Sequence, residues 1–272
     1  MHSTLLQLGP ITIKAFGLMM ALGFVAAWLA AVRLSRGTHR NADYIASLLV
    51  WMMVAGVVGA RLGYVAEHWT SEFASHPAAI IRIDQGGVMF YGGLIGAGLV
   101  LVLWTWQHHE HLLDLSDLLS VVLPLGHAFG RVGCFLNGCC HGRVSDSPFA
   151  VVFPAGSPAW NVQCDAGLIS PSSLAAKPVL PTQLFESGAN LLIFLFLYQL
   201  YRRTPGHRGL VTGVYFMAYS VVRFLIEPLR GDVRMSVGAF SIGQAISVAL
   251  FFAGSAILIW SLLKPAPRNI GA

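Results

Sequence analysis

The sequence predicts an all-α, polytopic integral membrane protein with about seven transmembrane helices and one long extracytoplasmic cap segment. Of its 272 residues, 56% are hydrophobic and only 11% are charged, and the mean hydropathy is +0.67. Soluble domains carry about 25% charged residues, so this composition excludes a large soluble core. In addition, the apolar residues recur in stretches close to the length of about 20 residues that a helix needs to cross a bilayer.

Seven apolar stretches are long enough to cross the membrane. The first has no small-residue cleavage site, so we expect a retained anchor and not a secretory signal peptide. The third contains the run YGGLIGAG, whose glycines permit close helix packing. The predicted spans cover residues 15–34, 44–66, 88–106, 115–136, 184–201, 210–228 and 240–263.

The stretch 137–182 is the one sizeable polar segment between the predicted spans, and it contains six prolines. We expect it to form a cap or a segment that gates substrate entry. No internal repeat or low-complexity tract divides the chain, so residues 1–272 are predicted to form a single transmembrane domain.

The loop charges predict the orientation of the chain in the membrane. The formal net charge is +5, but the basic residues are scattered between apolar segments, which is typical of topology signals and not of a nucleic-acid surface. With seven spans, three basic clusters fall on one side, which we expect to be cytoplasmic. The N-terminus and residues 137–182 are then extracytoplasmic. The clusters are Arg33, Arg36 and Arg40; Arg202, Arg203 and Arg208; and Lys264 and Arg268.

Residues 126–143, GHAFGRVGCFLNGCCHGR, lie in or beside a predicted span and yet contain many polar side chains. A charged side chain in the bilayer costs about 2.5–3.5 kcal/mol on insertion scales, so Arg131 is a functional candidate. Arg223 and Glu227 lie four residues apart on one helical face, which fits either an internal ion pair or part of a site. With Arg230 one turn further on, several guanidiniums near one interface favour an anionic lipid headgroup, because the planar guanidinium binds phosphate oxygens in pairs.

Three further polar residues leave two interpretations open. Arg61, in GARLGY, fits either headgroup binding or a helix–helix contact. Gln183 and Glu186 lie three residues apart at the start of the fifth predicted span, where an acid is also favoured by the helix dipole. The His108–His111 cluster is predicted to be a solvated turn.

The four cysteines are Cys134, Cys139, Cys140 and Cys164. The pattern C-x4-C-C-H lacks the paired spacing of zinc sites, so no metal and no other cofactor is expected. A disulfide between Cys139 and Cys140, or between Cys140 and Cys164, is an alternative outside the cytoplasm. Small buried thiols are the simplest interpretation.

Taken together, these segments resemble the prolipoprotein diacylglyceryl transferase family of bacterial inner membranes. The resemblance covers nearly the whole chain, in order, and its most specific parts are GRVGCFLNGCCHGR and the R-F-x-x-E-x-x-R element. The other matching segments are IKAFGLMMALGF, GARLGYV, FYGGLIGAG, PTQLFE and GVYFMAYSVVRFLIEPLR.

The resemblance implies transfer of the diacylglyceryl group of phosphatidylglycerol to the lipobox cysteine of a prolipoprotein, with release of glycerol phosphate. It implies that Arg131 and Arg223 hold the lipid phosphate and that Glu227 orients Arg223. Substrate contacts are expected from Gln183, Glu186, Arg230 and Arg61. The headgroup loop would be shaped by Asn137, Gly138 and Gly142.

Several positions depart from the family pattern on the side that activates the thiol. Tyr91 stands where the family commonly has a histidine, and an unperturbed phenol, with a pKa near 10, is a poor base. Cys134 and Cys139 stand in place of the usual Asn and Glu, and Phe16 in place of a Tyr. Tyr91 is kept as a catalytic candidate. The alternatives are a lipid-binding protein without transfer or with a changed acceptor, and thiol redox chemistry at Cys139 and Cys140.

Overall fold

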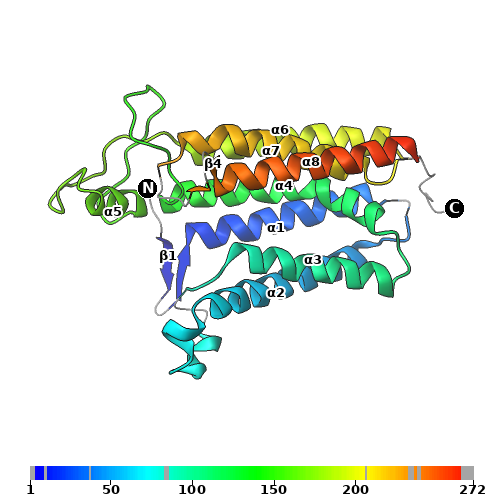
Figure 1. The fold of residues 1–272 in the computed structure, drawn as a ribbon, viewed down its shortest axis with the longest axis horizontal. Coiled ribbons are helices and arrows are strands. Elements are labelled where there is room, and N and C mark those ends of the chain that lie inside the picture. The colour runs from blue at the N-terminus through cyan, green and yellow to red at the C-terminus, as the bar shows by residue number, and fades with distance from the viewer. Residues whose placement is uncertain are drawn as a thin grey trace. The chain divides into compact units, whose positions relative to one another are not determined.

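The described part of the chain is mostly helical, as predicted (Figure 1). A computed structural model describes residues 4–8, 11–36, 38–82, 86–205, 207–231, 236–237 and 240–264. Within these residues, seven helices are long and apolar enough to cross a membrane, which confirms the predicted class. They are α1 (Ala15–Leu34), α2 (Ala42–Glu67), α3 (Phe90–Gln107), α4 (Leu112–Asn137), α6 (Thr182–Arg203), α7 (Leu210–Ile226) and α8 (Ile242–Leu263).

Shorter elements connect these helices. The described residues include two antiparallel pairs of strands, β1 with β2 and β3 with β4. The short elements are β1 (Thr4–Leu8), β2 (Ile11–Lys14), the π-helical turn η1 (Trp69–Phe73), the 3-10 turns η2 (Pro77–Ile81) and η4 (Glu227–Leu229), the helix α5 (Pro158–Asp165), β3 (Ser236–Val237) and β4 (Phe240–Ser241).

Large apolar side chains on the long helices are widely exposed. Leu29 of α1 is 55% exposed, Leu103 of α3 58% and Leu192 of α6 69%. Soluble monomers rarely expose apolar surface so extensively. These side chains therefore fit contact with lipid tails, in agreement with a multi-pass membrane protein.

The chain divides into two compact units, each of which is described by itself. The first unit comprises Met1–Ala31 and Asp117–Asn269, and the second comprises Val32–Ser116 and Ile270–Ala272. The boundaries fall inside α1 and α4. A single domain over residues 1–272 stays a prediction.

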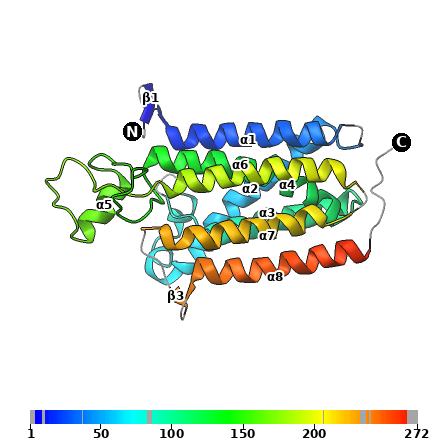
Figure 2. The same ribbon diagram turned by 90° about the horizontal axis from the view of Figure 1, so that it is seen from above.

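In the first unit, α7 lies beside both α6 and α8 (Figure 2). The start of α7 is fixed by Asp117 of α4, which is fully buried. Its two carboxylate oxygens accept N–H bonds from Gly209 and Thr212, each at 2.8 Å. Because the first N–H groups of a helix have no partner within the helix, this carboxylate caps α7.

The segment between α4 and α6 forms a small structure of its own. Its core consists of Phe153, Ala159, Ala176 and Val179. Helix α5 begins with Ser157, whose hydroxyl accepts the N–H of Trp160 at 3.3 Å. The predicted polar cap is therefore folded, although only one short helix lies within it.

In the second unit, α2 and α3 pack with their backbones in contact. A Cβ atom on Gly92 would clash with the carbonyl oxygen of Gly59, and a Cβ on Gly59 would clash with that of Gly92. Gly96 meets the carbonyl of Ala55 in the same way. The glycine-rich third span therefore allows the close packing that the sequence predicted.

The prediction of a solvated turn at His108–His111 is wrong for Glu110, whose side chain is 5% exposed. Arg40 donates to its Oε2 through Nε at 2.9 Å and Nη2 at 2.6 Å. The Tyr44 hydroxyl donates to Oε1 at 2.6 Å, and His39 Nε2 lies 2.8 Å from the same oxygen. Burial by itself would raise the pKa of Glu110, but these hydrogen bonds and the Arg40 charge hold that pKa below its ordinary value.

Candidate functional site

Five charged side chains of the first unit meet where α4, α6 and α7 come together. Arg131 lies near the end of α4, Glu186 near the start of α6, and Arg223 in the last turn of α7. Glu227 begins the 3-10 turn η4, and Arg230 follows it. We call these five residues the arginine–glutamate cluster.

Glu186 is the centre of the arginine–glutamate cluster. Its carboxylate lies 2.8 Å from Nη2 of Arg131, 4.0 Å from Nη1 of Arg223 and 3.9 Å from Nη1 of Arg230. Guanidiniums from three parts of the chain therefore converge on one carboxylate. The sequence indicated each of these residues separately, but not that Glu186 joins them.

Glu227 forms an ion pair with Arg223, and its role in orienting Arg223 stays a prediction. Glu227 Oε2 lies 2.7 Å from Arg223 Nη2, four residues apart in the chain. The Ser241 hydroxyl donates to Glu227 Oε1 at 2.9 Å. A Cβ on Gly243 would collide with this carboxylate, so a side chain there would displace it.

The members of the cluster differ in how far a ligand can reach them. The Glu186 and Arg230 side chains are 1% and 3% exposed, whereas Arg131 and Arg223 are 15% and 13% exposed. Buried charges persist when they are paired, so Glu186 stabilises the array from inside. Arg131 and Arg223 are therefore the two arginines of the cluster that a ligand can partly reach.

His127 belongs to this site although the sequence analysis did not assign it a role. Its Nε2 accepts the Arg131 Nε–H at 3.1 Å and lies 3.5 Å from Glu186 Oε1. Because Nε2 is already an acceptor, the contact with Glu186 is between two acceptors and is not an ion pair. The i,i+4 spacing of His127 and Arg131 on α4 was the signal that could have identified it.

The loop after α4 is tied to the start of α6. Gln183 donates its amide N–H to the Cys139 carbonyl at 2.8 Å, and the Thr182 hydroxyl donates to that of Cys140 at 3.1 Å. Asn137 ends α4, and Gly138 follows with φ 79°, a left-handed conformation that favours glycine. The predicted headgroup loop therefore turns directly beside the arginine–glutamate cluster.

Gly142 is closely approached by the protein's own backbone. A Cβ at Gly142 would come within 2.6 Å of the Leu180 carbonyl oxygen and 2.9 Å of that of Leu229. The Gly142 N–H donates a hydrogen bond to the Leu180 carbonyl oxygen at 2.8 Å. This close approach joins the loop to the segments before α6 and after α7.

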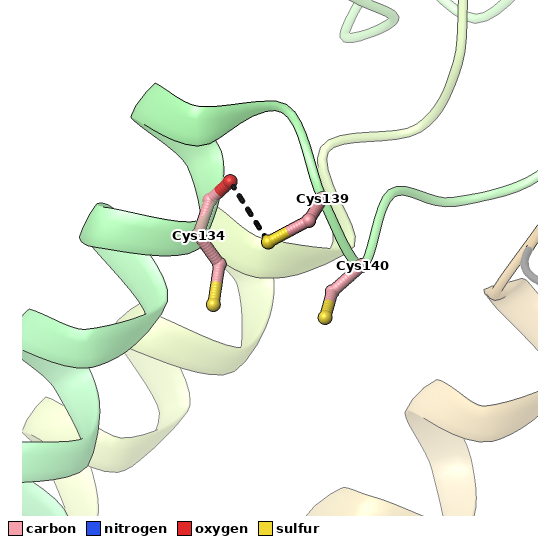
Figure 3. Close-up of side chains that lie close together, drawn as sticks. All are labelled: Cys134, Cys139 and Cys140. Atoms are coloured by element: carbon pink, nitrogen blue, oxygen red, sulfur yellow. Dashed lines mark hydrogen bonds between the residues drawn. The ribbon is translucent and has the colours of Figure 1, made fainter. Parts of the chain in front are cut away.

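Three thiols lie together at the end of α4 and in the following loop (Figure 3). The Sγ atoms of Cys134, Cys139 and Cys140 are all within 4.8 Å of one another, and we call them the thiol cluster. All four cysteines of the chain are free and half-buried, so neither suggested disulfide is present, and the thiols are less buried than predicted. Hydrogen bonds with the Cys134 and Cys139 thiols, and then Arg230, hold the pKa of Cys140 below its ordinary value.

Two predicted site residues, Arg61 and Tyr91, belong to the second unit. Arg61 donates to the carbonyls of Ala79, Ile80, Gly86 and Gly87 at 2.7–2.8 Å. Arg61 therefore fixes the segment before α3 and does not form the helix–helix contact that the sequence suggested. Headgroup binding by Arg61 stays a prediction. Tyr91 lies in the first turn of α3 and is 47% exposed.

The fold and the arginine–glutamate cluster define a multi-pass membrane protein with an arginine-rich polar site at the ends of three helices. Comparison with known proteins identifies the family to which this membrane protein belongs. Residues 3–260 match the prolipoprotein diacylglyceryl transferase family, and the chain belongs to this family. The predicted resemblance and the transferase class are therefore confirmed.

Individual relatives match over nearly their full length. A phosphatidylglycerol–prolipoprotein diacylglyceryl transferase of Pseudoalteromonas translucida is 32% identical over 97% of this chain and 94% of its own length. One from Burkholderia orbicola (strain MC0-3) is 30% identical over 96% of this chain and 94% of its own. One from Pseudomonas aeruginosa is 29% identical over 97% and 94%, respectively.

Proposed function

We propose that this chain transfers the diacylglyceryl group of phosphatidylglycerol to the lipobox cysteine thiol of prolipoproteins, the first step of bacterial lipoprotein maturation. The convergence of Arg131, Arg223 and Arg230 on Glu186 carries this proposal. Such an array suits a phosphate that gains negative charge as its ester C–O bond breaks. The names of the relatives, which state both substrates, support it.

The exposed fractions assign different roles within the cluster. Arg131 and Arg223 are partly accessible and bind the lipid phosphate, while Glu227 and the buried Glu186 and Arg230 hold them in place. Because the donors are oriented before the substrate arrives, they stabilise the leaving phosphate without reorganisation. Substrate contacts by Gln183, Asn137, Gly138 and Gly142 remain part of the proposal.

The proposed reaction takes place at the outer face of the bacterial inner membrane. In this arrangement, the N-terminus and residues 137–182 are extracytoplasmic and the C-terminus is cytoplasmic. Cys164 of the cap segment offers a test with a membrane-impermeant maleimide applied to intact spheroplasts. Labelling of Cys164 that disappears in Cys164→Ser supports this orientation, whereas labelling only after lysis contradicts it.

The test of function is mass spectrometry of a synthetic lipobox peptide incubated with the purified protein and phosphatidylglycerol. We expect a mass gain of one diacylglyceryl group. Arg131→Ala should slow transfer about 10²–10³-fold, the usual effect of losing one preorganised donor. Arg203→Ala serves as the matched control, because Arg203 is exposed and ends α6 away from the cluster.

Two outcomes would contradict the proposal. Full activity of Arg131→Ala and Arg223→Ala would remove the phosphate-holding role. No mass gain, with phosphatidylglycerol still bound, would instead indicate a lipid-binding relative without transfer or with another acceptor. Tyr91→Phe tests the phenol separately: a loss as large as that of Arg131→Ala would make Tyr91 the proton acceptor.

A further inference from the structure

The thiol cluster has no part in binding the lipid phosphate, yet its geometry is closely controlled. Cys134 comes from the last turn of α4, while Cys139 and Cys140 come from the loop (Figure 3). Cys140 has φ 59°, a left-handed conformation that residues other than glycine keep only when their surroundings impose it. The Thr182 and Gln183 side chains impose it here, by binding the carbonyls of the two loop cysteines.

The spacing of the sulfur atoms suits a soft metal ion. Zinc binds thiolates at about 2.3 Å, so two sulfurs on a tetrahedral zinc lie about 3.8 Å apart. The three Sγ atoms are already within 4.8 Å of one another, so each pair needs to close by about 1 Å or less. Side-chain rotation supplies such a shift without moving the helix.

The charges around the thiol cluster also suit a bound zinc ion. Three thiolates around Zn²⁺ carry a net charge of about −1, which needs nearby cations in a partly buried place. The Cys140 thiol interacts with the Arg230 side chain, and Cys134 and Cys140 both lie close enough to Arg131 to act on its charge. Arg131 and Arg230 therefore supply positive charge close to these sulfur atoms.

The three sulfur atoms would leave the fourth coordination position of a tetrahedral zinc ion open. Within the described ranges, no histidine or carboxylate joins the three sulfurs. Zinc sites that act on substrates commonly have three protein ligands and keep the fourth position for water or substrate. The three cysteines are half-buried, so the open position is reachable from outside.

We propose that Cys134, Cys139 and Cys140 bind Zn²⁺ as thiolates and that the acceptor cysteine of the prolipoprotein occupies the fourth position. This inference rests on the proposed function and supplies its missing step. When the acceptor S–H binds the metal, its proton leaves to solvent and a zinc-bound thiolate remains. No histidine base is then required at the position of Tyr91.

The zinc-bound sulfur attacks the terminal glyceryl carbon with an electron pair, a C–S bond forms, and the C–O bond to phosphate breaks. The electron pair of that bond leaves on the phosphate oxygen beside Arg131 and Arg223, so glycerol phosphate departs as an anion. The product thioether is neutral and a weaker ligand than a thiolate, which favours its release.

The first test measures metal binding by the full-length protein, without reference to activity. The reduced, metal-free protein is titrated with Zn²⁺ alone, and bound zinc is measured by elemental mass spectrometry. We expect about one zinc per chain. Cys139→Ser and Cys140→Ser should lower the affinity at least tenfold, whereas Cys164→Ser, in the cap segment, should leave it unchanged.

The second test asks whether the acceptor thiol completes the site. Cd²⁺ replaces zinc at thiolate sites and gives a thiolate-to-metal charge-transfer absorption. Adding a lipobox peptide should raise this absorption by about one third, because a fourth thiolate joins three. A peptide with serine in place of the lipobox cysteine should leave it unchanged.

The third test separates this inference from the proposed function. Removing the metal should slow diacylglyceryl transfer about 100-fold or more, and Zn²⁺ should restore it. Undiminished transfer by metal-free protein would overturn the zinc proposal while leaving the transferase intact. Metal and peptide binding without any transfer from phosphatidylglycerol would instead overturn the transferase. Failure of the unaltered, reduced protein to bind zinc would also overturn the zinc site.

Discussion

Glu186→Gln is the change that tests the site most directly, because one carboxylate faces three guanidiniums. At an effective dielectric constant of about 20, the 2.8 Å contact with Arg131 corresponds to about 6 kcal/mol of attraction. The contacts with Arg223 and Arg230, at 4.0 and 3.9 Å, correspond to about 4 kcal/mol each. The cost of burying these ions offsets most of that attraction.

The net effect follows from what the substitution leaves behind. Glutamine keeps the shape of the side chain but leaves three cations facing one another without their shared anion. Removing one partner of a buried ion pair typically costs about 3–5 kcal/mol, and we expect a loss in that range. The free energy of unfolding is measured by titration with a denaturing detergent in mixed micelles.

Two controls make the result interpretable. Asp146→Asn neutralises an exposed acid of the same unit and should change stability by less than about 0.5 kcal/mol. Combining Glu186→Gln with Arg131→Gln should recover part of the loss, because one unpaired cation is removed. If Glu186→Gln matched Asp146→Asn, Glu186 would not be the centre of the cluster and the reasoning would be wrong.

Three further predictions concern the fold. Asp117→Asn should lower the free energy of unfolding by about 1.5–3 kcal/mol, because the charged acceptor for the N–H groups at the start of α7 is lost. Gly92→Ala should cost about 1–3 kcal/mol, since the new Cβ meets the Gly59 carbonyl; a proteolysis or unfolding assay detects this. The lowered pKa of Glu110 means that its ionised form stabilises the fold above its ordinary pKa. That stabilisation is lost as the pH falls from the ordinary pKa of a glutamate through the lowered value, so over this acid range the wild type should lose more stability than Glu110→Gln.

Each of these predictions has a matched control. Asp146→Asn is also the control for Asp117→Asn. Gly98→Ala lies on α3 with no atom within 4 Å of the added Cβ, so a cost equal to that of Gly92→Ala would contradict the packing argument. Glu67→Gln removes an exposed acid of the second unit, and its pH dependence should follow the wild type.

The architecture could be predicted from the sequence, because the length and apolarity of a membrane span are local properties. The predicted stretch 15–34 coincides with α1, and the other spans differ from the helices by a few residues at their ends. The i,i+4 spacing likewise identified the pair of Arg223 and Glu227, since one helical turn places them together. Close packing at the glycines of α3 followed from composition for the same local reason.

Contacts between residues that are distant in the chain could not be predicted in this way, because they depend on how the helices pack. Glu186 is indicated by sequence as a helix-start acid, and nothing local shows that three arginines surround it. Glu110 looked solvated because its partners Arg40 and Tyr44 lie about 70 residues earlier in the chain. The spacing of Cys134, Cys139 and Cys140 argued against a metal, but the left-handed turn at Gly138 and Cys140 brings their sulfurs together. Sequence spacing records local periodicity, whereas a site is made by contacts between segments that only the folded chain places side by side.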